Sequence, residues 1–546
     1  MAAPAPPDGR ANRAFGGVKP QTATSPARGL PAQQRSASLR SYAGTPAIVA
    51  AGTLIVLLGV SALLRTGSLS GPFWIDEGLS VGIASHSLTD IPGLLRQDGS
   101  PPLYYMLLHV WMNAFGTSES ATHSLSLLFS LLTVPVALWA GWSLFGRRAG
   151  LVAATLAAVN PVLSAYAQET RMYSLLALLG LATAAAYVHV FAYRRRGYLA
   201  LLVPCIAAML YTHNWAAFFC LGAVAALIPV LRESQDRRAI AIDAVIAFGL
   251  AGLLYLPWVP TLLSQAAHTG APWASHPPVK DLTHASYVIL GNAQIATALA
   301  LAGGFGIAAV IRRRVSSAES IAAISLLTMV LVALVVAWVY SQTTLAWAPR
   351  YLIVLTGPLL LLASLGVARA GKLGLAGAAI AVYASVLLTS SYVPENKSNV
   401  ERLADRLGGR VRAGDLVIST QPEQVANLNY YLPKGLRYAT PMGPVPDPGV
   451  MDWRDAVDRL RAATPARDLR PLIESLPPGQ QVLLVSPVTR RSGWRSKWTG
   501  LVKERAHEWE DAIAADPQLA ELKRLKRPRT RSRLSTVKAV LYVKRH

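Results

Sequence analysis

Long apolar runs constrain this chain more than any other feature of its sequence. Several of them reach the roughly 20 residues that a helix needs to cross a bilayer. The runs are Pro46–Leu64, Ala121–Phe145, Ala149–Ala165, Met172–Ala192, Tyr198–Tyr211, Trp215–Leu231, Ala239–Val259, Asn292–Ile311, Ser320–Tyr340, Tyr351–Val367 and Leu373–Tyr392. Only 15% of the residues are charged, whereas a soluble protein carries about 25%. We therefore predict a polytopic α-helical membrane protein with about 11 transmembrane helices.

One shorter apolar stretch, Leu103–Phe115, decides the predicted topology. It is amphipathic and too short to cross the hydrocarbon core, so we expect an interfacial or re-entrant helix. With this choice, the N-terminal tail and all the basic clusters between helices lie on one side, which the positive-inside rule identifies as the cytoplasm. Those clusters are Arg147-Arg148, Arg194–Arg196, Arg232 with Arg237-Arg238, Arg312–Arg314 and Arg369 with Lys372. The prediction is a cytoplasmic N-terminus and an extracytoplasmic C-terminus.

Composition divides the chain into three predicted parts. Residues 1–42 are rich in Ala, Pro, Gly, Ser and Arg and read as a disordered basic cytoplasmic tail. Residues 43–393 hold the apolar runs, and residues 394–546 are mixed and charged. This last part has strand-like and helical segments, which suit one small extracytoplasmic α/β domain. The segments are Asp415–Ser419, Gln481–Val485 and Val537–Tyr542 for strands, and Gln421–Tyr431, Met451–Ala462 and Gly500–Leu525 for helices.

The formal net charge of +23 is concentrated outside the apolar runs. Positive-inside topology and anionic lipid headgroups account for such a charge. No nucleic-acid recognition motif accompanies it. We expect the lipid bilayer, and no nucleic acid, among the partners.

Asp76 and Glu77 are adjacent in the segment Phe73–Gly78, just after the first apolar run. Taken alone, they read as two solvated loop carboxylates. An acidic pair among Trp, Phe and Pro at a membrane boundary is nevertheless costly to desolvate and needs a partner or a function. Asp98 lies in the same predicted external loop, just before Pro101-Pro102. A carboxyl group in an apolar pocket can have its pKa raised and serve as a general base.

Two further predicted external junctions carry polar residues. Glu169 and Arg171 lie in Tyr166–Tyr173, where they either pair with each other or face a phosphate and an acceptor. His213 and Asn214 form a tight hairpin between two helices. A histidine at a helix end is usually a capping or interfacial group, and a substrate contact is the alternative.

Arg350 opens a late apolar run at its predicted external end, followed by Tyr351. An arginine in this place opposes the positive-inside trend. Its planar fork of donors suits a phosphate, and a helix N-terminus also favours anions. These properties predict a lipid-phosphate site, with an arginine that reaches toward lipid headgroups as the alternative.

We expect no metal or other cofactor. His268, His276 and His284 recur at a spacing of eight residues, which is not a zinc-ligand spacing. The sequence has no P-loop, no GxGxxG and no DxD on the predicted cytoplasmic side. The donor is therefore not expected to be a nucleotide or a nucleotide sugar.

Four of these elements together resemble the bacterial dolichyl-phosphate-mannose-protein mannosyltransferase-like family. This family belongs to the GT-C superfamily, which also holds the lipid A aminoarabinose transferases. The elements are Asp76-Glu77, Pro101–Tyr105, Glu169–Tyr173 and Pro349–Leu352, and the resemblance covers about Pro46 to Tyr392.

The resemblance implies an inverting glycosyltransferase of the bacterial plasma membrane. Its donor would be a polyprenyl-phosphate-linked mannose or pentose, and its acceptor an extracytoplasmic protein, lipid or cell-envelope glycan. Asp76 would then be the catalytic base, with Glu77 supporting the geometry or the acceptor, and Arg350 with Arg171 would hold the donor phosphate. Further substrate contacts are expected from Asp98, Tyr104, Glu169, Tyr173, His213, Asn214 and Tyr351.

Two other functions stay open from the sequence alone. A lipid or sugar transporter or flippase tends to show repeated halves, broken helices and charges near the membrane midplane. Here the charges lie at the predicted outer boundary and no internal repeat is evident. A non-catalytic scaffold that displays the C-terminal domain does not explain why acids and arginines share one face.

Overall fold

The computed structural model describes residues 32–313, 317–392, 397–489, 494, 496–525 and 535–545. Residues 1–31 of the predicted basic tail lie outside the described residues. Helix α1 (Ala32–Arg65) begins inside the range predicted for that tail. The chain divides into two compact units, residues 1–52 and 53–546. All the predicted site residues belong to the second unit.

Nine spans in the described part of the chain are long and apolar enough to cross a membrane. The polytopic helical class is therefore confirmed. The helices of these spans are α1, α5 (Glu119–Phe145), α8 (Tyr173–Tyr187) with η1 (Val188–Ala192), α10 (Ala216–Ala225) with α11 (Leu227–Glu233), α12 (Arg237–Tyr255) with η3 (Leu256–Trp258) and α13 (Val259–His268), α16 (Ala293–Arg313), α17 (Ala318–Tyr340), η4 (Pro349–Leu355) with α18 (Thr356–Arg369), and α19 (Gly371–Tyr392).

The other two predicted apolar runs form shorter helices. The run Ala149–Ala165 is divided into α6 (Arg147–Val159) and α7 (Pro161–Tyr166). Proline has no N–H to continue the first helix, and Asn160 Oδ1 caps the second by accepting from the backbone N–H groups of Val162 and Leu163, both at 2.9 Å. The run Tyr198–Tyr211 forms η2 (Arg196–Tyr198) and α9 (Leu199–Thr212). The count of membrane-length helices is therefore lower than the number of apolar runs.

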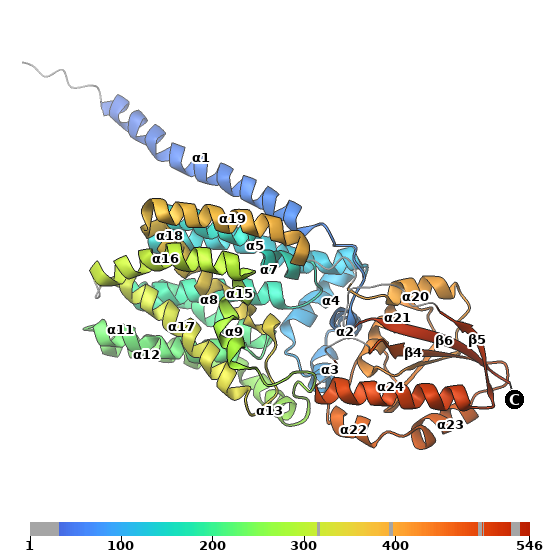
Figure 1. The fold of residues 1–546 in the computed structure, drawn as a ribbon. Coiled ribbons are helices and arrows are strands. Elements are labelled where there is room, and N and C mark those ends of the chain that lie inside the picture. Colours follow the sequence, from blue (N-terminus) through green and yellow to red (C-terminus); the bar gives the residue numbers. More distant parts are fainter. Residues whose placement is uncertain are drawn as a thin grey trace, which may run out of the picture. The chain divides into compact units, whose positions relative to one another are not determined.

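Three short helices lie where the helical bundle meets the C-terminal domain (Figure 1). They are α2 (Ile75–Ala84), α3 (Ile91–Asp98) and α4 (Leu103–Phe115). Helix α4 has the bounds predicted for the amphipathic stretch. Its buried residues Tyr104, Tyr105, Leu108 and Met112 recur at helical spacing, and the helix packs on α2 and α5.

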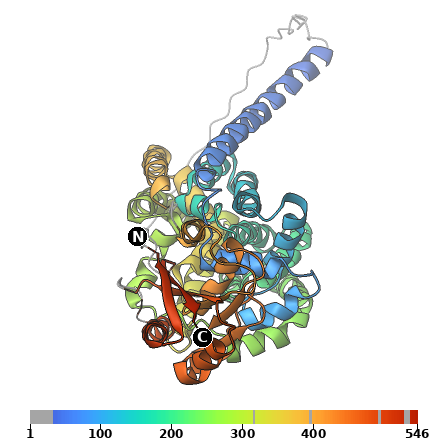
Figure 2. The ribbon, with the colours of Figure 1, turned by 90° about the vertical axis from the view of Figure 1, so that its right-hand side faces the viewer.

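The described residues between 397 and 545 form a mixed six-stranded sheet with helices on both faces, which confirms the predicted α/β domain. Figure 2 views the molecule from the side of this domain. The strand order is β3-β2-β1-β4-β6-β5, with β1 parallel to β2 and β4 and the other pairs antiparallel. The strands are β1 (Leu416–Ser419), β2 (Arg437–Thr440), β3 (Gly443–Val445), β4 (Gln481–Pro487), β5 (Leu519–Arg524) and β6 (Val537–Lys544).

Side-chain alternation along the strands gives this domain two cores. Val417 packs with the residues of α20 and α21, whereas Leu416 and Ile418 pack with those of α23 and α24. The remaining elements are α14 (Val279–Thr283), α15 (Ala285–Leu290), α20 (Val400–Leu407), η5 (Pro422–Gln424), α21 (Val425–Tyr431), α22 (Ala456–Ala462), η6 (Pro465–Leu469), α23 (Arg470–Glu474) and α24 (Lys497–Ala515).

The last predicted helix, Gly500–Leu525, is shorter than expected. Helix α24 ends at Ala515, because Pro517 follows closely and cannot continue a helix. The residues that follow form the edge strand β5 instead.

The C-terminal domain packs directly on α2. A Cβ added to Gly82 would overlap the backbone carbonyl of Gly449, so this approach requires glycine. Asn427 Nδ2 donates to the backbone oxygen of Phe73 at 2.9 Å. The domain thus contacts the helix that carries the acidic pair, as well as Phe73, which lies two residues before that helix.

Candidate functional site

Three charged side chains from distant parts of the chain converge at the first turn of α2. Asp76 Oδ2 lies 3.5 Å from Arg350 Nη2 and 3.9 Å from Arg171 Nη2. The exposed fractions of the three side chains are 20%, 25% and 12%, in the order Asp76, Arg350, Arg171. Partial burial strengthens such pairs relative to surface ones. The centre holds two guanidinium groups against one paired carboxylate, which suits an added anion.

Arg171 is held in place by several acceptors. Its Nη1 donates to the backbone oxygen of Asp76 at 3.3 Å, to Ser80 Oγ at 3.1 Å and to the Tyr105 hydroxyl at 3.3 Å. Its Nε has no hydrogen-bond partner among the described residues. A fixed guanidinium with one free donor can bind an anion without reorganising.

Arg350 is held mainly by aromatic rings. Its Cζ atom lies 5.8 Å from the ring centroid of Trp74 and 5.4 Å from that of Tyr351, which are cation–π distances. Its Nε also lacks a partner within the described part of the chain. Both arginines therefore keep donor capacity beside Asp76.

Glu77 has a different set of partners from its neighbour Asp76. It is fully buried, and its Oε1 lies 2.6 Å from His123 Nε2 and accepts from Lys397 Nζ at 2.8 Å and from the backbone N–H of Thr170 at 2.9 Å. Burial raises the pKa of Glu77, but the charges and hydrogen bonds of Lys397 and His123 outweigh it and lower the pKa to about 2. Glu77 is thus a fixed anion whose hydrogen bonds connect α2 to Thr170 and Lys397.

Lys397 and His123 were not among the residues that the sequence singled out. Lys397 follows the last membrane helix and is 4% exposed. It also donates to the backbone oxygen of Gln168 at 2.6 Å. The available signal was indirect, because a buried acid at a membrane boundary requires a cationic partner, but no local pattern says which cation it is.

Glu169 and Asp98 complete the group of acids. Burial raises the pKa of Glu169 to about 7; Lys397 lowers it, while the charges of Glu77 and Asp76 raise it. Burial also raises the pKa of Asp98, against the opposing effects of a hydrogen bond from Ser100 and the charge of Arg171. Glu169 can therefore exchange a proton near neutral pH, whereas Glu77 cannot.

Neutral aromatic groups form one side of the centre. The ring centroid of His213 lies 4.5 Å from that of Tyr351 and 6.2 Å from that of Tyr173. His213 Nδ1 accepts from the backbone N–H of Trp215 at 3.1 Å, and burial with two nearby arginines lowers the pKa of His213 to about 3. The Tyr173 hydroxyl has no partner among the residues described. The structure thus places His213, Tyr173 and Tyr351, three of the predicted site residues, next to one another.

Tyr104 and Asn214 take supporting positions. The Tyr104 hydroxyl lies 3.0 Å from Ser126 Oγ, which donates to the backbone oxygen of Arg171 at 3.1 Å. Asn214 Nδ2 donates to the backbone oxygen of Gly99 at 3.2 Å, next to Asp98. Their direct contact with a substrate stays a prediction.

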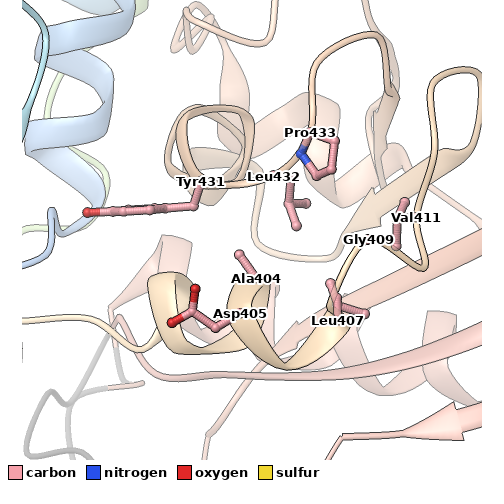
Figure 3. Close-up of a pocket in the computed structure, with 8 residues that line it drawn as sticks. All are labelled: Ala404, Asp405, Leu407, Gly409, Val411, Tyr431, Leu432 and Pro433. Atoms are coloured by element: carbon pink, nitrogen blue, oxygen red, sulfur yellow. The ribbon is translucent and has the colours of Figure 1, made fainter.

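A separate pocket of about 310 Å³ lies in the C-terminal domain, between α20 and the segment Tyr431–Pro433 (Figure 3). The Tyr431 ring lines it, and its hydroxyl points out of it (Figure 3). That hydroxyl accepts from the backbone N–H of Phe73 at 2.8 Å and donates to Glu119 Oε1 at 2.9 Å. None of the predicted site residues lines this pocket.

Comparisons with known proteins show which solved structures have a similar fold. No family model matches the sequence, and no curated protein matches it. ArnT from Cupriavidus metallidurans is similar in structure in the apo state, with a TM-score of 0.59, 14% identity, and coverage of 90% of this chain and 98% of that chain. ArnT bound to undecaprenyl phosphate gives the same TM-score and identity, with coverage of 90% and 97%.

An oligosaccharyltransferase from Archaeoglobus fulgidus, solved in complex with Zn and sulfate, is also similar. Its TM-score is 0.52 at 13% identity, over 79% of this chain and 67% of that chain. The chain is therefore a multi-pass helical membrane protein whose fold is similar to that of ArnT and of this oligosaccharyltransferase.

Proposed function

We propose that this chain is an inverting glycosyltransferase. It would take a sugar, mannose or a pentose, from a polyprenyl-phosphate donor and pass it to an extracytoplasmic acceptor. The supporting observation is the centre in which Arg350 and Arg171 flank Asp76. One structure with this fold contains undecaprenyl phosphate, and a phosphate monoester or diester is the ligand that paired guanidinium groups suit.

In the proposed mechanism, phosphate oxygens of the donor accept hydrogen bonds from Arg350 and Arg171. The phosphate shares the charge of both guanidinium groups, so their ion pairs with Asp76 weaken. The carboxylate takes the proton from an acceptor hydroxyl as that oxygen attacks C1 of the sugar. The bond between C1 and the phosphate oxygen breaks, and polyprenyl phosphate leaves with the electron pair, stabilised by the arginines.

A single displacement of this kind inverts the anomeric carbon and forms no covalent enzyme intermediate. The phosphate is a competent leaving group, so the reaction needs no strong general acid. Glu77 acts as a positioning residue, because its network holds the first turn of α2 against Gln168 and Thr170. Asp98, Glu169 and the aromatic side of the centre would contact sugar or acceptor hydroxyls.

The predicted topology is part of the proposal. Asp76, Arg171 and Arg350 come from three loops that the distribution of basic residues assigns to the outside. Their contacts in the structure support the proposal that the three loops lie on the same side of the membrane, because residues on opposite faces of a bilayer cannot form one site.

The function is tested by incubating the purified protein with a panel of radiolabelled polyprenyl-phosphate sugars and a cell-envelope extract. We expect label to move to the extract, with polyprenyl phosphate released in equal amount. The competing transporter or flippase would instead move an intact lipid-linked sugar across the bilayer of a proteoliposome without breaking the C1–O bond.

Arg350→Ala is expected to weaken use of the donor more than turnover. The concentration of donor for half-maximal rate should rise about tenfold or more, because a charge-assisted hydrogen bond contributes about 1.5–3 kcal/mol. Arg350→Lys should recover part of the loss, since the charge is kept but the fork is lost. Arg232→Ala, at an exposed position, is the matched control, and an unchanged donor dependence in Arg350→Ala would remove this residue from the phosphate site.

Glu169→Gln is expected to flatten the pH dependence of stability. The pKa of Glu169 is about 7 in the folded protein, against an ordinary value of 4.5, so the folded state binds the extra proton between these values. Stability then falls as pH rises from about 4.5 to 7. At pH 8 the free energy of unfolding of the variant should exceed that of wild type by about 1–3 kcal/mol, and its melting temperature should be higher. At pH 4.5 the two proteins should differ little. The measurement is the melting temperature of both proteins as a function of pH. If the two curves run parallel between pH 4.5 and 8, the raised pKa of Glu169 is contradicted.

A further inference from the structure

Helix α21 of the C-terminal domain holds Phe73, which lies two residues before α2. The backbone N–H of Phe73 donates to the Tyr431 hydroxyl at 2.8 Å, and its backbone oxygen accepts from Asn427 Nδ2 at 2.9 Å. Both partners belong to α21, and Phe73 and Asn427 are fully buried. Both polar groups of this backbone residue are therefore fixed by side chains that lie 358 and 354 residues farther along the chain.

The same helix also contacts the first turn of α2. The backbone N–H of Trp74 donates to Glu77 Oε2 at 3.2 Å, so this carboxylate reaches back to the residue before the helix, as in a capping box. Asp76 is the second residue of α2. A Cβ added to Gly78 would come within 2.6 Å of Asn427 Oδ1, so no larger residue fits there. The backbone is thus held by α21 on both sides of Asp76.

The domain holds α2 with the edge of its sheet at which α/β domains bind ligands. Elements η5 and α21 follow the carboxyl end of β1, whose parallel neighbours β2 and β4 lie on opposite sides of it. In open α/β sheets a ligand crevice forms at this position. Here η5 and α21 pack on α2 (Figure 1). Ile75 and Leu79 of α2 share one apolar cluster with Ala426 and Trp453 of the domain.

We propose that the C-terminal domain positions the catalytic base, with Asn427 and Tyr431 as the positioning residues. This inference rests on the proposed function and concerns the same centre. Arg171 and Arg350 come from other parts of the helical bundle, and none of their hydrogen bonds and ion pairs among the described residues involves α21. Helix α21 therefore sets the position of Asp76 relative to the two arginines. A displacement of about 1 Å at a reacting group can cost about a hundredfold in rate.

The neighbouring Tyr430 is a matched control. Its ring centroid lies 4.8 Å from that of Phe73, and the ring centroid of Tyr431 lies 6.4 Å from it, so both rings pack near Phe73. The Tyr430 hydroxyl donates to the backbone oxygen of Thr117 at 3.0 Å, whereas the Tyr431 hydroxyl bonds Phe73 and Glu119. Replacing either tyrosine by Phe removes one hydroxyl and keeps the ring. Only Tyr431→Phe releases the backbone that leads into α2.

The test compares Tyr431→Phe and Tyr430→Phe with wild type in the full-length protein. A radiolabelled polyprenyl-phosphate sugar is the donor, and a cell-envelope extract supplies the acceptor. The transfer rate at saturating donor is divided by the amount of protein that binds polyprenyl phosphate. We expect this rate constant to fall about tenfold or more in Tyr431→Phe. The donor concentration for half-maximal rate should stay within about twofold of wild type, because both arginines keep their places.

Two further measurements keep the test independent of folding and of the single variant. In Tyr431→Phe, and not in Tyr430→Phe, hydrogen exchange followed by mass spectrometry should be faster in the peptide that contains Phe73, because its N–H has lost its acceptor. Asn427→Leu has a side chain of similar volume but cannot donate to the backbone oxygen of Phe73. We expect the same loss of rate constant in this variant, again with little change in the donor dependence.

A purely structural role of Tyr431 would lower the melting temperature and the amount of protein that binds polyprenyl phosphate, but leave the rate constant per binding-competent molecule unchanged. That result overturns the inference, as does an equal loss of rate constant in Tyr430→Phe. In both cases the proposed function stands, because wild type is active. If wild type transfers no sugar from any donor, the proposed function itself fails, and the positioning role fails with it.

Discussion

Asp76→Asn should abolish sugar transfer in a protein that still folds and binds its donor. Asn has the size of Asp but cannot accept the proton of the attacking hydroxyl, and loss of one such group commonly costs about a hundredfold or more in rate. The change also frees Arg350 and Arg171 from their ion pairs, so the affinity for polyprenyl phosphate should stay equal or increase. Single-turnover release of labelled sugar and equilibrium binding of polyprenyl phosphate measure the two effects separately.

Asp455→Asn is the control for this variant, because the only ion pair of Asp455 among the described residues is with the exposed His268. It should leave both measurements unchanged. A rate close to wild type in Asp76→Asn would remove this carboxylate from the chemistry and direct attention to Glu169, which has a pKa of about 7 beside the same centre.

Lys397→Met is expected to produce the largest loss of stability. It leaves the buried carboxylate of Glu77 without its lysine partner, and removing one member of a buried ion pair costs about 3–5 kcal/mol. Transfer should fall with it, since Glu77 holds the loop that carries Thr170 against the first turn of α2. Thermal unfolding in detergent and the transfer assay measure the two consequences.

The double variant Glu77→Gln/Lys397→Met separates positioning from stability. Removing both charges should restore much of the stability that either single change loses, because no unpaired charge stays buried. If Glu77 positions α2, the double variant stays slow in transfer despite its recovered stability. Recovery of both properties would show a purely structural role, and Lys434→Met, at an exposed position, serves as the matched control.

Much of this architecture follows from local chemistry. The apolar runs predict the membrane helices because a bilayer leaves a helix few alternatives, and Leu103–Phe115 is a helix with those bounds. The apolar run Ala149–Ala165 is divided at Asn160, because Pro161 and the capping side chain of Asn160 end one helix and begin the next. Likewise, Pro517 marks the end of α24, although the polar residues beyond it gave no indication of an edge strand.

The candidate site shows the same division more sharply. Arg171 and Arg350 could be predicted near Asp76, because an arginine at the predicted external boundary of a membrane needs an anion. Lys397 and His123 could not be predicted as the partners of Glu77, since they come from two distant segments of the chain.

The sequence by itself determined the membrane class, the loops that carry the chemistry and the charged groups available to it. Only the tertiary structure decided which partners each carboxylate meets. Asp76 and Glu77 are neighbours in the chain, but successive residues of a helix point about 100° apart. One therefore meets two arginines at a partly open centre, and the other meets Lys397, 320 residues away, in the protein interior. Such long-range partnership is set by packing, which no local pattern encodes.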